Sequence, residues 1–140
     1  MAPKEPFHLA LPVNDIDKAR DFYTRVLKCK PVRSAEAWVD FDFFGHQLVI
    51  HRNPIHKGHT FANIVDGHSV PVPHFGIVMG WDDWHALADR LKKTGVRFVV
   101  EPYIRHKNKF GKQATMFFLD PSGNALEFKA FAEPAKRFSR

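Results

Sequence analysis

The sequence has almost no cysteine and no long hydrophobic run. Cys29 is the single cysteine among 140 residues, so the chain cannot form an internal disulfide, and a reducing, cytoplasmic location is expected. Apolar runs are only a few residues long, which excludes a membrane-spanning helix. No apolar stretch follows Lys4 near the start of the chain, so we expect no secretory signal and no membrane partner.

Basic residues are in excess, but no nucleic-acid-binding signature accompanies them. The formal net charge is +6 at pH 7, and Lys and Arg concentrate only at 105–112 and in the tail 136–140. Because no zinc-finger, helix-turn-helix or ribonucleoprotein motif is present, we predict no nucleic-acid partner. The tail is expected to be solvated. Segment 105–112 is either a solvated loop or a loop that attracts an anionic substrate.

The first half of the chain has the pattern of a β-α-β-β-β unit. Residues 7–13 form an apolar run typical of a strand, and Asn14 and Asp15 offer a helix N-cap. Apolar residues at helical spacing follow over 16–27. Strand candidates then occur around 41–43 and 48–50, separated by a turn at Gly45.

The second half repeats this order. Residues 73–79 predict a strand, 82–91 a helix with Gly95 as its C-terminal cap, and three further strands are expected over 96–100, 114–119 and 125–131. His8 and His74 are 66 residues apart while Gly45 and Gly123 are 78 apart, so the second half carries about a dozen extra residues. We place them around 105–111, between the helix and the last two strands.

The repeat predicts one α+β domain over 1–140, in which two paired βαβββ modules form a curved mixed sheet around a cavity. The candidate ligands described below indicate that this is a metal-containing cavity. Module 1 is expected over about 7–53 and module 2 over about 73–131. Residues 54–72, rich in His, Gly and Pro, are interpreted as a linker or mobile loop, and 132–140 as a basic tail.

Three residues suggest a metal site. His8 and His74 occupy matching positions on the first strand of each half, and equivalent residues of two similar half-sheets converge on a shared concave space. Glu127 lies mid-strand between Leu126 and Phe128, so it faces either solvent or a polar cavity. Two imidazoles and one carboxylate form the facial triad of Fe(II) and other divalent metals, with open positions for substrate.

These features together resemble the vicinal oxygen chelate superfamily, which includes glyoxalase I, extradiol ring-cleaving dioxygenases, and fosfomycin- and bleomycin-resistance proteins. The resemblance covers about residues 7–131. It is carried by the His8 strand followed by Asp15–Tyr23 and Leu27, by His74, and by 118–124 (Phe-Leu-Asp-Pro-Ser-Gly-Asn) before Glu127. It implies a divalent metal on His8, His74 and Glu127, a substrate bound through vicinal oxygens, and a homodimer, with the site formed within one chain or across two.

Departures from the family pattern favour one branch. Glyoxalase I typically has a fourth protein ligand, yet aligning Gly45 with Gly123 places Val49 opposite Glu127. His51 lies two residues further on the same strand face. It either replaces that ligand or contacts the metal ligands without binding the metal itself. Bleomycin-resistance proteins lack the triad altogether. Three ligands with open positions resemble the extradiol dioxygenases, which implies Fe(II), with Mn, Ni or Zn as alternatives.

We therefore predict a ring-cleaving dioxygenase that binds a catechol-like small molecule and dioxygen. A glyoxalase-like isomerase or lyase using Ni or Zn, and a metal-free small-molecule binding module, are the alternatives. The candidates for moving protons are His51, Tyr103 and His106. The candidates for contacting the substrate are cationic or aromatic: Arg105, Lys107, Trp38 and Phe43.

Overall fold

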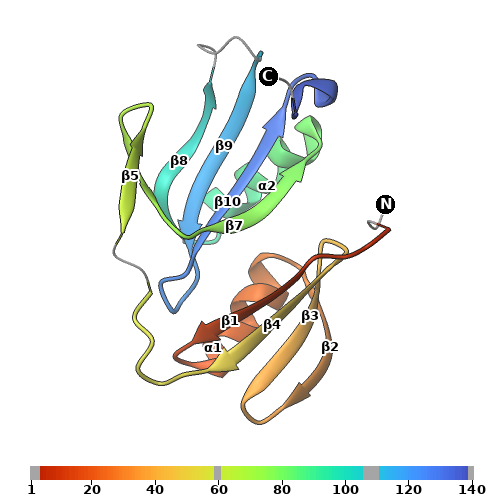
Figure 1. The fold of residues 1–140 in the computed structure, drawn as a ribbon, viewed down its shortest axis with the longest axis vertical. Coiled ribbons are helices and arrows are strands. Elements are labelled where there is room, and N and C mark those ends of the chain that lie inside the picture. The colour runs from red at the N-terminus through yellow and green to blue at the C-terminus, as the bar shows by residue number, and fades with distance from the viewer. Residues whose placement is uncertain (1–3, 59–60, 106–110, 139–140) are drawn as a thin grey trace. The chain divides into compact units, whose positions relative to one another are not determined.

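The computed structural model describes residues 4–58, 61–105 and 111–138, which fall into two compact units. The first unit contains residues 1–58 together with the turn 120–124, and the second contains the remainder of the chain. Each unit has one four-stranded mixed sheet, as Figure 1 shows. The predicted α+β fold of two βαβββ modules is confirmed.

The first unit follows the predicted order. It consists of β1 (His8–Val13), α1 (Ile16–Asp21), a π-helical turn (Phe22–Val26), β2 (Lys30–Ala35), β3 (Trp38–Phe43) and β4 (His46–Arg52). The sheet order is β1-β4-β3-β2, with β1 parallel to β4. The side chain of Asp15 caps α1 by accepting from the backbone N–H groups of Asp17 and Lys18. Helix α1 packs on β3 and β4, and this side of the sheet carries the core.

The second unit repeats this plan with one addition. It consists of β5 (Ala62–Val65), β6 (His68–Pro71), β7 (Phe75–Met79), α2 (Trp81–Lys92), β8 (Arg97–Arg105), β9 (Gln113–Leu119), β10 (Ala125–Phe131) and a short 3-10 helix (Pro134–Lys136). The sheet order is β7-β10-β9-β8, with β7 parallel to β10. Helix α2 packs on β9 and β10 through Trp84, Leu87, Ala88 and Leu91.

Two segments differ from the sequence-based expectation. The segment expected to be a linker contains the hairpin β5–β6, whose turn places Asp66 and Gly67 at positive φ (51° and 79°). This is the geometry of a type I′ turn, which Asp-Gly favours. Strand β8 continues through Arg105, beyond the expected end at residue 100, because two register shifts against β9 absorb extra residues.

The turn at 120–124, part of the motif before Glu127 that carries the resemblance, has a structural role in the first unit. Asp120 is 2% exposed, and one of its carboxylate oxygens, Oδ1, accepts from the backbone N–H groups of Ser122 and Asn124. The other, Oδ2, accepts from the Tyr23 hydroxyl at 2.8 Å. Asn124 in turn donates to the backbone carbonyl of Pro12. The Asp-Pro-Ser-Gly-Asn turn is therefore fastened to the π-helical turn and to β1 rather than placed for chemistry.

Replacing Tyr23 by phenylalanine tests this fastening. The substitution removes a buried hydrogen bond to a carboxylate, so we expect the free energy of unfolding to fall by about 1–3 kcal/mol. Tyr103→Phe makes the same chemical change at a partly exposed tyrosine and is expected to cost less than about 0.5 kcal/mol. Urea unfolding of both variants measures the difference, and equal stability losses would contradict a fastening role for Tyr23.

Candidate functional site

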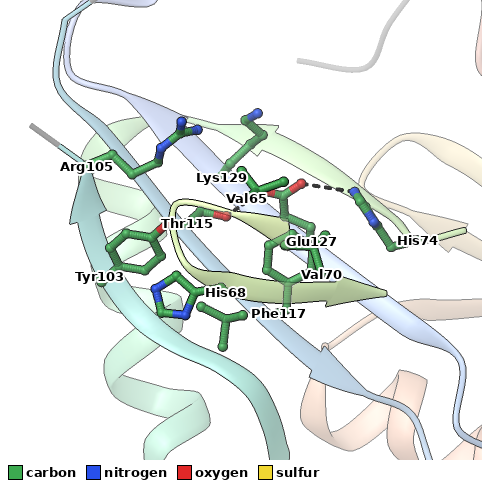
Figure 2. A pocket seen from close by; sticks show the side chains of 11 residues that line it. Val65, His68, Val70, His74, Tyr103, Arg105, Thr115, Phe117, Glu127 and Lys129 are labelled. Atoms are coloured by element: carbon green, nitrogen blue, oxygen red, sulfur yellow. Dashed lines mark hydrogen bonds and ion pairs between the residues drawn. The ribbon is translucent and has the colours of Figure 1, made fainter. Parts of the chain in front are cut away.

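His74 and Glu127 form a pair in the second unit. His74 immediately precedes β7, and Glu127 lies on β10, where it pairs with Gly76. The Nε2 atom of His74 lies 3.2 Å from Oε1 of Glu127, and the Thr115 hydroxyl donates to Oε2. The Glu127 side chain is only 15% exposed and lines a cavity, so it does not face open solvent. Figure 2 shows the pair at one side of this cavity.

The two groups shift each other's ionisation. The hydrogen bond to Glu127 raises the pKa of His74, and this effect outweighs the opposing effect of burial. Burial acts to raise the pKa of Glu127, but the hydrogen bonds from His74 and Thr115 outweigh it and lower that pKa. Glu127 is therefore held as a carboxylate, which is the form that binds a cation.

The cavity of about 150 Å³ lies on the face of the second sheet that carries Glu127. Two rows of paired residues form its floor. In one row Glu127 pairs with Phe117 and Phe117 with Val100, and in the next Lys129 pairs with Thr115 and Thr115 with Tyr103. A cavity of this volume is large enough for a single six-membered ring, since engineered cavities of about 150 Å³ bind benzene.

The hairpin β5–β6 contributes Val65, His68 and Val70 to the cavity wall. Asp66 at its turn forms an ion pair with Arg105 and accepts from the Tyr103 hydroxyl at 3.4 Å. The His68 and Tyr103 rings lie 4.9 Å apart between centroids. Burial and the Asp66 carboxylate raise the pKa of Tyr103, although Arg105 opposes them, so its hydroxyl remains a hydrogen-bond donor at neutral pH.

His8 occupies the matching position in the first unit. His8 lies two residues before Ala10, which pairs with Val49, just as His74 lies two residues before Gly76, which pairs with Glu127. The register therefore places Val49 at the position equivalent to Glu127, as the alignment of the two turns predicts. Because Val49 has no donor atom, the first module supplies no carboxylate at this point.

The ring nitrogens of both histidines are arranged as metal ligands require. Nδ1 of His8 lies 2.7 Å from Oε1 of Gln47, and Nδ1 of His74 lies 2.7 Å from the carbonyl oxygen of Pro71. Since a carbonyl oxygen only accepts, each Nδ1 carries the proton and each Nε2 keeps its lone pair when the ring is neutral. Metal-binding histidines are usually oriented by such bonds. The donor set of His8, His74 and Glu127 thus fits a divalent metal.

Within either unit, the described residues contain no group of three or more His, Cys, Asp or Glu side chains that could hold a metal. His74 and Glu127 belong to the second unit, and His8 to the first. The three-ligand site remains a proposal.

The other predicted site residues are distributed as follows. Tyr103 and Arg105 line the cavity, although the Arg105 guanidinium is paired with Asp66. His51 is exposed on β4, four residues beyond Gln47, which corresponds to about 13 Å along a strand. It is therefore too distant from His8 to share its metal within this unit. His106 and Lys107 lie outside the described residues.

The two aromatic residues predicted to contact the substrate lie on opposite faces of β3. Trp38 is half-buried, whereas Phe43 is 4% exposed and belongs to the core of the first unit. Strand alternation explains the difference, because residues 38 and 43 are an odd number of positions apart. Phe43 therefore has a packing role and is not carried into the proposed site.

Sequence reasoning did not assign three polar cavity residues to the site: His68, Thr115 and Lys129. Lys129 follows from alternation, because it lies two residues after Glu127 on the same face of β10. His68 follows from the Asp-Gly turn signal, which predicts a hairpin where we expected a linker. Thr115 has no comparable signal, because its approach to Glu127 depends on the pairing of β9 with β10.

Two βαβββ modules in one chain define the fold class of the vicinal oxygen chelate proteins. The model of the glyoxalase/bleomycin resistance protein/dioxygenase superfamily matches residues 6–128, and the chain belongs to this family. Members of the family typically bind a divalent metal and small-molecule substrates, and they commonly form dimers. Among the described residues, no helix has the length and apolar character needed to cross a membrane.

Solved structures support the assignment. The chain is 32% identical to a glyoxalase/bleomycin resistance protein/dioxygenase from Alicyclobacillus acidocaldarius, with a TM-score of 0.78 over 96% of this chain and 97% of that one. It shares its fold with the fosfomycin resistance protein FosX from Listeria monocytogenes (17% identity, TM-score 0.70, 97% and 99% covered). It also shares it with a lactoylglutathione lyase from Agrobacterium tumefaciens (18% identity, TM-score 0.64, 99% and 98% covered).

Proposed function

We propose that the protein is a divalent-metal-dependent enzyme acting on a small substrate with two neighbouring oxygens, and that its reaction is ring cleavage by dioxygen. The observation that carries the proposal is that Nδ1 of His8 and Nδ1 of His74 are each bound by a carbonyl oxygen. This directs Nε2 of each ring away from that carbonyl, and Nε2 of His74 lies beside Glu127, where a metal would replace the proton that the two groups share. Glu127 completes a set of two imidazoles and one carboxylate, which is typical of non-haem Fe(II) oxygenases.

The ligand count favours the dioxygenase over the glyoxalase-like alternative. A four-ligand site would need a donor at Val49 or His51, yet Val49 is apolar and His51 lies about 13 Å along the strand from Gln47. The fixed imidazoles argue against the metal-free binding module, because a protein without a metal has no need to orient both Nε2 atoms. Fe(II) is the proposed metal.

When bound, the metal would polarise the two substrate oxygens and, as iron, supply electrons to dioxygen. The chain itself does the remainder. Thr115 and His74 hold Glu127 ionised and fixed in orientation. The Tyr103 hydroxyl stays protonated, so it donates to an oxygen that gains negative charge. His68 lies against Tyr103. Besides His74, it is a cavity-lining histidine among the described residues, and its imidazole can accept a proton from the substrate.

Oxygen uptake tests this function. Protein reconstituted with Fe(II) under anaerobic conditions and then given air and a panel of catechols is expected to consume one dioxygen per ring opened. An oxygen electrode and the absorbance of the product measure the reaction, and His8→Ala serves as the inactive control. Metal uptake without oxygen consumption across the panel would contradict the dioxygenase, whereas a preference for Ni or Zn would favour the isomerase or lyase.

A further inference from the structure

The cavity holds a cation that the proposed function does not use. Lys129 lies on β10, two residues after Glu127 and on the same face of the strand, and its side chain lines the cavity. We propose that Lys129 binds a carboxylate on the substrate, so that the enzyme acts on ring diols bearing an acid group. This inference rests on the proposed function, because it assumes that the substrate oxygens are held at His74 and Glu127.

The acidic groups around Lys129 are already engaged. Both oxygens of Glu127 are occupied, one by His74 and the other by Thr115. Asp66 is paired with Arg105 and accepts from Tyr103. Among the described residues Lys129 forms no ion pair, and its ammonium group lies 5.7 Å from the centroid of the Phe131 ring. Its charge acts to lower the pKa values of His74 and Glu127 without an ion pair to either. Its charge is therefore available to a ligand.

Arg105 is less suited to this role even though it lines the same cavity. Its guanidinium is paired with Asp66, which neutralises its charge and fixes the arginine to the hairpin turn. Figure 2 shows the side chains of Lys129 and Arg105 directed toward the same side of the cavity. Lys129 therefore supplies both the free donors and the uncompensated positive charge at this side.

The spacing suits a single ring. The Cα atoms of residues two apart on a strand are separated by about 7 Å, which is comparable with the length of a ring that carries hydroxyls at one end and a carboxylate at the other. A ring whose neighbouring oxygens meet the metal at one end would present a carboxylate to Lys129 at the other. The apolar side chains of Val70, Val100 and Phe117 line the space between and would contact the ring itself.

A pair of matched probes tests the inference without turnover. 3,4-Dihydroxybenzoate and 3,4-dihydroxybenzamide have nearly the same size and the same neighbouring hydroxyls, but only the first is anionic. Their dissociation constants for Zn²⁺-loaded protein, which does not react with dioxygen, are measured by calorimetry. We expect wild type to bind the benzoate at least about tenfold more tightly, because charge-assisted hydrogen bonds are the stronger ones.

Variants assign the preference to Lys129. Lys129→Met is expected to remove the preference, because it weakens benzoate binding far more than benzamide binding, and Lys129→Arg is expected to retain it. Lys92→Met, at an exposed position of α2, makes the same charge change elsewhere and should leave the preference intact. A preference that is absent in wild type, or that persists in Lys129→Met, overturns the inference while benzamide binding still supports the proposed function. If neither probe binds, the proposed function fails and this inference fails with it.

Discussion

Replacing Glu127 by glutamine is expected to weaken divalent metal binding at least about a hundredfold, because even groups that only orient a ligand contribute ten- to a hundredfold. Glutamine has nearly the same shape and keeps an oxygen that accepts from Thr115, so the cavity should survive the substitution. It lacks the negative charge of Glu127. In wild type the hydrogen bonds from His74 and Thr115 lower the pKa of Glu127 and so keep it ionised.

Competition with a chromophoric chelator measures the metal affinity, and urea unfolding of the metal-free protein shows whether the fold is retained. Glu101→Gln is the matched control, because Glu101 is an exposed residue of β8. If Glu127→Gln binds metal as tightly as wild type while Glu101→Gln is also unaffected, Glu127 is not a ligand.

Mixing two inactive variants then locates the site. If His8 of one chain acts with His74 and Glu127 of a second chain in a homodimer, a mixed dimer of His8→Ala and Glu127→Gln contains one site with both substitutions and one intact site. Unfolding and refolding the mixture should then restore part of the metal binding. If all three ligands come from one chain, the mixture binds no better than its components.

The fold could be predicted wherever local pattern and tertiary environment agree. Strands β1, β9 and β10 each bury apolar residues, and α2 buries the four apolar residues that the helical spacing predicts. Strands β2 and β5 could not be found in this way, because every residue of each is exposed. An exposed strand has no hydrophobic periodicity, and its existence depends on the neighbouring strand with which it pairs.

The candidate site was predictable to the extent that it repeats between the modules. Aligning two similar units identifies His8 and His74 and shows that Val49 stands where a second carboxylate would be. The strand register agrees with that alignment. The residues that hold these ligands could not be predicted, because Gln47, Pro71 and Thr115 approach them through strand pairing or a neighbouring turn. Similarly, Phe43 resembles a ring-binding residue in the sequence, and only the sheet assigns its face to the core.

Gly76 is a further residue whose importance follows from the structure alone. It pairs with Glu127, and β7 approaches β10 so closely there that a Cβ atom would overlap the carbonyl oxygen of Glu127 and lie 2.6 Å from its carbonyl carbon. Both are backbone atoms in the middle of a sheet, so no side-chain rotation can relieve the overlap. Only glycine allows His74 and Glu127 to be brought together by these two strands.

Gly76→Ala is therefore expected to destabilise the protein by about 3 kcal/mol or more, at the upper end of what overpacking costs, since β7 must separate from β10. Gly80→Ala is the control, because its new Cβ meets only Asp83 Oδ2 at 3.6 Å, and it should cost less than about 1 kcal/mol at this helix N-cap. Urea unfolding compares the two. If Gly76→Ala folds as stably as Gly80→Ala and keeps wild-type metal affinity, the close approach of β7 to β10 is not what positions His74 against Glu127. If Gly76→Ala loses both stability and metal affinity, the same backbone contact supports the sheet and the proposed metal ligands.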